Sequence, residues 1–159
     1  MKKIFKKWKS FLFEGVVNTR EELIDMVSAS PNQEIYIDSP AGNKKKFGGL
    51  QGSVLPFDYG EWPRLINPAD NMGWDLIIVP SSSERNINLL PVGHVQYHDE
   101  DEIWERVGKE KPINISHNTK IILANDSIYY TDDVDIIEDF FKKLVQFKSV
   151  VWYTKIKAK

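Results

Sequence analysis

The most informative segment of this chain is Asp70-Asn71-Met72-Gly73-Trp74-Asp75, which leads directly into Leu76-Ile77-Ile78-Val79-Pro80. The apolar run 76–80 predicts a short buried strand, and the residues before it predict a turn at the strand's edge. Turns of this kind often carry functional groups, because the strand fixes the backbone while the side chains remain free to converge. Asp and Asn also favour turns for purely local reasons, so this stretch alone is compatible with a site or with an ordinary turn.

The composition is that of an ordinary globular domain, with 42% hydrophobic and 28% charged residues among 159. The formal net charge of −2 gives no reason to expect nucleic acid as a partner. The absence of cysteine excludes disulfides and thiol catalysis, and it fits a reducing, cytoplasmic compartment. No apolar run reaches the length of a membrane span. We therefore expect residues 1–159 to form one cytoplasmic domain, and assembly into a homo-oligomer stays open.

Residues 1–17 are a basic segment in which apolar side chains follow helical spacing, namely Ile4, Phe5, Trp8, Phe11 and Leu12. One interpretation is an amphipathic helix that rests on an anionic membrane surface. The other, which we favour, is a segment that docks its aromatic side chains on its own domain. The segment is too short, and too often interrupted by lysine, for a secretory signal.

Residues 34–155 are predicted to form the core of the domain. Alternating or continuous apolar residues predict strands over 34–38, 87–97, 119–124 and 149–153. An amphipathic helix is expected from Asp132 or Asp133 to Phe147, whereas Pro56, Pro63 and Pro68 predict an irregular segment before Asp70. This order of elements predicts an α+β fold, with an antiparallel sheet or small barrel and helices packed outside it.

Several of these segments together resemble the soluble family I inorganic pyrophosphatases. The resemblance rests on Tyr59-Gly60, on the segment 70–80, on Pro91-Val92-Gly93-His94-Val95 followed by Asp99, on Lys120-Ile121-Ile122, and on the late helix around 137–141. Order and spacing agree with that family over roughly residues 34–147. The resemblance implies a five-stranded, OB-like closed barrel with helices packed outside and an acidic cavity.

In that family, carboxylates hold Mg²⁺ ions against pyrophosphate, so the resemblance implies Mg²⁺ (or Mn²⁺) as cofactor and a small phosphorylated ligand as partner. Its implied metal ligands are Asp70, Asp75 and Asp99, of which Asp70 and Asp75 are also the implied catalytic residues. Phosphate contacts would come from Lys46, Tyr59 and Lys120, and Asp38 would stand for the carboxylate of the first strand. A solvated loop is the usual explanation for a run such as lysines 44–46, and phosphate contact is the alternative. For Asp99–Glu102 we favour a solvated helix start, with the acidic residues at the positive end of the helix dipole.

Two positions depart from the family pattern. The middle aspartate of its motif falls on Met72, whose thioether is a poor ligand for Mg²⁺ and cannot accept a proton. A second aspartate falls on Asn118, which offers an oxygen without charge. The leading hypothesis is therefore Mg²⁺-dependent hydrolysis of pyrophosphate, or a related phosphoanhydride, at an altered site. The alternative is a catalytically inactive member of the fold that binds a phosphorylated ligand or a protein.

Overall fold

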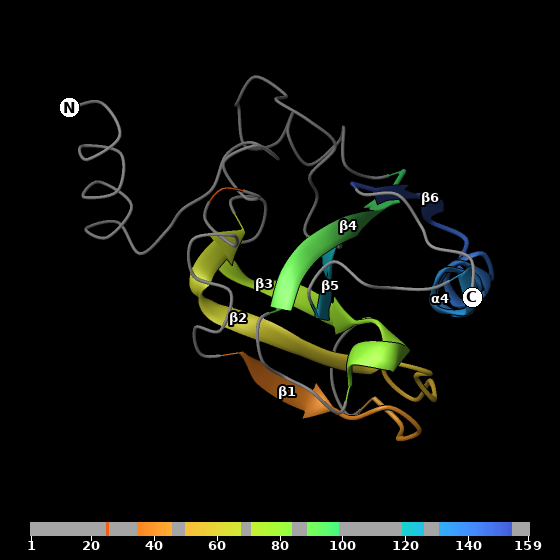
Figure 1. The fold of residues 1–159 in the computed structure, drawn as a ribbon, viewed down its shortest axis with the longest axis horizontal. Coiled ribbons are helices and arrows are strands. Elements are labelled where there is room, and N and C mark those ends of the chain that lie inside the picture. Colours follow the sequence, from red (N-terminus) through yellow and green to blue (C-terminus); the bar gives the residue numbers. More distant parts are fainter. Residues whose placement is uncertain are drawn as a thin grey trace.

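The computed structural model describes residues 25, 35–45, 50–67, 71–83, 89–98, 119–125 and 131–153. Six strands form one sheet: β1 (Tyr36–Ser39), β2 (Asp58–Asn67), β3 (Met72–Ile78), β4 (Leu89–Tyr97), β5 (Lys120–Asn125) and β6 (Phe147–Trp152). A short 3-10 helix, η1 (Pro80–Ser82), follows β3, and the α-helix α4 (Thr131–Phe141) precedes β6 (Figure 1).

The strand order in the sheet is β1-β2-β3-β5-β4-β6. Strands β3 and β5 pair in parallel, and the other neighbouring strands pair antiparallel. The α+β class predicted from the sequence is therefore confirmed. The closed barrel is not confirmed: β1 and β6 are the two edges of an open sheet in the described part of the chain.

The segment before Asp70 was predicted to be irregular, and this prediction was wrong for residues 58–67, which form strand β2. Pro63 lies inside this strand, and the register with β3 shifts between Trp62 and Ile66. A proline cannot donate a hydrogen bond to the ladder, so within a sheet it is tolerated at such a bulge. Gly60 then allows β1 to approach closely, because a Cβ there would overlap the carbonyl oxygen of Tyr36.

Strand β3 begins at Met72, four residues earlier than the sequence predicts, so most of the expected turn belongs to the strand. Asn71 adopts a left-handed backbone with φ of 59°, which asparagine tolerates better than most residues. Met72 pairs with Asn67 of β2, and Asp75 lies in the middle of β3. The strand therefore fixes the backbone of Asp75.

The helix α4 is shorter than predicted. It begins at Thr131 and ends at Phe141, so Asp133 lies in its first turn, where its carboxylate accepts hydrogen bonds from Ser81. The helical spacing of apolar residues continues to Phe147, but β4 pairs with residues from Phe147 onward and draws them into β6. Tertiary pairing thus overrides the local helical pattern.

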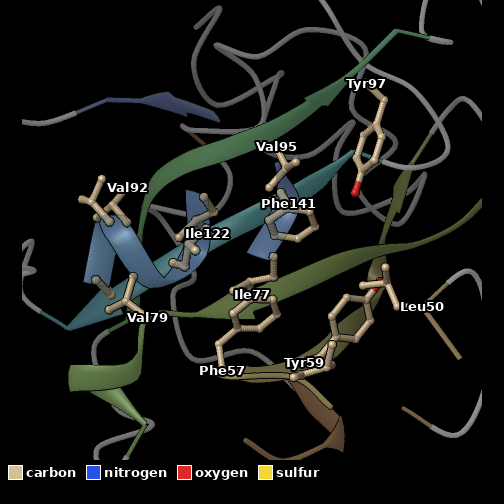
Figure 2. Close-up of a cluster of buried hydrophobic side chains, with 14 residues drawn as sticks. Leu50, Phe57, Tyr59, Ile77, Val79, Val92, Val95, Tyr97, Ile122 and Phe141 are labelled. Carbon is tan, nitrogen blue, oxygen red and sulfur yellow. The ribbon is translucent and has the colours of Figure 1, made fainter. Parts of the chain in front are cut away.

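Both faces of the sheet are buried. One face packs with α4 into a first cluster of buried side chains, in which Phe141 of the helix lies against Phe57, the residue before β2, with ring centroids 5.8 Å apart (Figure 2). The opposite face carries a second cluster, which contains Trp62, Trp74 and Leu76. Figure 2 shows Tyr59, Tyr97 and Leu50 together at one end of the first cluster.

Several predicted segments lie outside the described residues, and their predictions stand as made. They are the basic segment 1–17, the acidic run 99–102 and the candidate ligands Asp70, Asp99 and Asn118. No helix among the described residues is both long enough and apolar enough to span a bilayer.

Candidate functional site

A cavity of about 310 Å³ opens at the end of the first cluster that carries the two tyrosines. The strands and the loop after β1 supply most of its charged and aromatic lining, and the turn between α4 and β6 supplies another wall. The lining residues are Asp38, Lys45, Leu50, Tyr59, Asp75, Tyr97, Lys120, Leu144, Val145 and Gln146.

Strand alternation explains why three of the predicted site residues meet here. Asp75 precedes the buried Ile77 by two positions, and Lys120 precedes the buried Ile122 by two, so each points to the same face as its core neighbour. Asp75 and Lys120 are also direct partners in the parallel pairing of β3 and β5. Tyr59 belongs to the same cluster as Ile77 and Ile122. The sequence therefore brings these three side chains together through the ordinary geometry of a sheet.

Two ion pairs define the charge of the cavity. Lys120 Nζ lies 3.4 Å from Asp75 Oδ2, and Lys45 Nζ lies 3.5 Å from Asp38 Oδ2. Both lysine side chains are only 6% exposed, and buried cations in proteins need compensating groups. The distances exceed the roughly 2.7–2.9 Å of a tight charge-assisted hydrogen bond, so a phosphate oxygen could compete for either ammonium group.

Tyr59 lies between the two pairs. Lys45 Nζ is 4.7 Å, and Lys120 Nζ 5.5 Å, from the centre of its ring, distances at which the ring face attracts a cation. Burial raises the pKa of Tyr59 well above its ordinary value, and the charge of Asp75 and a hydrogen bond to it raise it further. The hydroxyl is therefore protonated at neutral pH and acts as a hydrogen-bond donor.

Asp38 has one carboxylate oxygen in use and one that is not. Its Oδ2 faces Lys45, whereas Oδ1 is buried with no hydrogen-bond partner in the described part of the chain. A buried acceptor of this kind calls for a partner such as water, a donor or a cation. Mg²⁺ favours oxygen ligands and is commonly held by one or two carboxylates together with substrate phosphates.

The donor types therefore suit a hard cation beside a phosphate. Within the described ranges, however, no three His, Cys, Asp or Glu side chains gather as a metal site. Asp38 and Asp75 supply two carboxylates, enough for one such ion in that mode of binding. The several ions that the resemblance implies would need further ligands from Asp70 or Asp99, which lie outside the described residues.

The predicted site residues divide into two groups. Asp38, Tyr59, Asp75 and Lys120 line the cavity. Asp70, Asp99 and Lys46 lie outside the described residues. Met72, which stands where the resemblance implies an aspartate, does not line the cavity. It lies two residues before Trp74 in β3, so the two side chains point to the same face of the sheet, away from the cavity. Met72 is 62% exposed.

Sequence reasoning missed several lining residues. Lys45 occupies the cavity, but nothing in the run 44–46 distinguishes it from its neighbours. Tyr97 ends strand β4 and gave no signal beyond its place in an apolar segment. The wall formed by residues 144–146 was predicted to be helix. The turn exists because α4 ends at Phe141, before the predicted end of the helix at Phe147.

No protein-family model matches the chain, and neither a curated protein nor a solved structure shows significant similarity to it.

Proposed function

We propose that this protein binds pyrophosphate, or a related small phosphoanhydride, together with Mg²⁺ in the cavity and hydrolyses it to phosphate. The observation that carries the proposal is the meeting of Tyr59, Asp75 and Lys120 around one cavity with a second lysine–aspartate pair. The resemblance implies a site role for each of these three residues, and their meeting at one cavity supports that role.

The strand order supports the finer part of the fold prediction. In an OB-like barrel the third and fifth strands pair in parallel and the fourth lies beside the fifth, and β3, β5 and β4 are arranged in this way. We propose that the sheet is an opened version of that barrel.

Five charged or hydroxyl-bearing lining residues have physical roles in this proposal. Lys45 and Lys120 would turn from their carboxylates to the oxygens of the ligand, and Tyr59 would donate a hydrogen bond to it. Asp38 and Asp75, released from the lysines, would hold the metal ion. When bound, Mg²⁺ neutralises charge on the phosphate oxygens and lowers the pKa of water at the site.

A second candidate is ligand binding without turnover. It is favoured by the position of residue 72, because the family's proton acceptor would be replaced here by a side chain on the far face of the sheet. Both described carboxylates of the cavity also face lysines, so each already has a charged partner. The ligand and the residues that contact it are the same in both candidates.

Phosphate release from pyrophosphate with Mg²⁺ or Mn²⁺ tests the proposal. Asp75→Asn should lower the rate about 10²-fold or more, whereas Asp139→Asn, a matched change on the exposed surface of α4, should leave it unchanged. A wild type that equals the blank, yet binds pyrophosphate in calorimetry, supports binding without turnover. A wild type that neither hydrolyses nor binds pyrophosphate refutes both candidates.

A further inference from the structure

The lining that comes from the turn between α4 and β6 differs in chemistry from the charged residues of the cavity. This apolar wall comprises Leu144 and Val145, which lie next to Gln146, and Leu50 is a further apolar lining residue. The two cations among the described lining residues, Lys45 and Lys120, are paired with the carboxylates Asp38 and Asp75. The lining of this cavity therefore offers a ligand both charged and apolar groups.

The apolar wall is held in place by backbone hydrogen bonds. Leu144 N donates to Phe141 O over 3.0 Å, and Phe147 N donates to Leu144 O over 3.2 Å. The carbonyl oxygen of Gln146 accepts a hydrogen bond from His98 N over 2.9 Å, which ties the turn to the end of β4. A wall fixed in this way presents its side chains to a ligand without the entropy cost of ordering a loose loop.

Val145 is the residue of this wall with most to gain from a ligand. It is 98% exposed, although it lines the cavity, so its side chain stands at the mouth. Leu144, by contrast, already packs against the first cluster. Covering Val145 with an apolar group removes its surface from water, which is favourable in proportion to the area covered.

We infer that the ligand is an organic phosphate compound, in which the phosphates face Lys45 and Lys120 and a small apolar group lies against Val145. This inference rests on the proposed function, because it assumes that the lysines bind phosphate. A cavity of about 310 Å³ is at the lower end of the sizes, roughly 300–1,000 Å³, that hold small organic ligands. Inorganic pyrophosphate, which is polar on every side, leaves the apolar wall unused.

Calorimetry with non-hydrolysable ligands tests the inference on the full chain. The probes are methylenediphosphonate and its mono-methyl and mono-n-butyl esters, each with Mg²⁺. The two esters carry the same charge and differ by three methylene groups. Partial burial of these groups should make the butyl ester bind about tenfold more tightly than the methyl ester.

Two substitutions assign that preference to the wall. Val145→Ser should reduce the ratio of the two affinities to about threefold or less. Met72→Ser, a matched change at an exposed apolar residue outside the cavity lining, should leave the ratio at about ten.

Equal binding of the two esters to the wild type, or a ratio that Val145→Ser leaves unchanged, overturns the inference. If methylenediphosphonate binds and both esters are rejected, the inference fails while the proposed phosphate site survives. If none of the three probes binds, the proposed function and the inference fail together.

Discussion

The two faces of the sheet are made by the same strands but carry different chemistry. On β3, Asp75 lines the cavity while its neighbour Trp74 is fully buried in the second cluster. On β5, Lys120 lines the cavity while Ile121 is fully buried in the second cluster. A step of one residue therefore separates a candidate binding group from a purely structural one. Substitutions on the second face should lower stability, and substitutions at the cavity should lower ligand binding.

The largest effect is expected on the second face. Trp74→Ala removes a fully buried indole and should lower the free energy of unfolding by about 3–5 kcal/mol, measured by urea denaturation. Trp74→Phe should cost much less, because it keeps an aromatic ring and removes an Nε1 donor that is buried with no partner among the described residues. Ligand affinity of the folded fraction should not change. A loss below 1 kcal/mol for Trp74→Ala would contradict the assignment of this face to stability.

Gly60→Ala should lower both stability and ligand affinity, because it displaces the backbone. The added Cβ would overlap the carbonyl of Tyr36, so β1 must move away from β2 at a cost of about 1–3 kcal/mol. The displacement would also move Asp38 relative to Tyr59, and ligand affinity should fall with stability. Thermal unfolding and calorimetry measure the two effects. Unchanged affinity would show that β1 does not position the site.

Lys120→Met should separate binding from stability. Loss of one charge-assisted contact should weaken pyrophosphate binding about tenfold. Stability should fall by less than about 1 kcal/mol, because the Asp75 side chain remains 33% exposed and solvated. Lys142→Met, at an exposed position outside the cavity lining, is the control and should bind as the wild type does. Equal affinities for the two variants would refute the role of Lys120.

Tyr59→Phe should change how stability depends on alkaline pH. The pKa of Tyr59 is raised in the folded protein, whereas the unfolded tyrosine titrates near 10. Above about pH 10 the unfolded chain loses this proton first, so the contribution of Tyr59 to stability is present below that pH and is lost as the pH rises through the folded pKa. The wild type should lose stability faster than the variant there, by at most about 1.4 kcal/mol per pH unit. Urea denaturation across pH 8–11 measures the difference, and parallel curves would contradict the raised pKa.

The smallest effect is expected at Met72. An aspartate there would face the side opposite Asp75, with the two Cα atoms about 10 Å apart along the strand. Met72→Asp should therefore leave stability within about 0.5 kcal/mol and should neither create nor raise phosphate release. A clear gain of activity would show that the side chain at 72 reaches the cavity, and it would remove the distinction between the two faces in this part of β3.

Some features of this protein follow from the sequence alone. Local side-chain patterns predict strands near β1, β3, β4, β5 and β6, because alternation and apolar runs are properties of neighbouring residues. The same alternation explains why Asp75 and Lys120, which the resemblance implied as site residues, lie on the face that carries Ile77 and Ile122.

Other features depend on pairing between segments far apart in the chain, and local patterns do not contain them. The bulge that accommodates Pro63 exists because β2 pairs with β3, and α4 ends at Phe141 because β4 takes the following residues into β6. The pairing of β4 with β6 also places the turn 144–146 beside the cavity. The choice of Lys45 among three consecutive lysines likewise depends on Asp38 and Tyr59, which only the tertiary structure brings within reach.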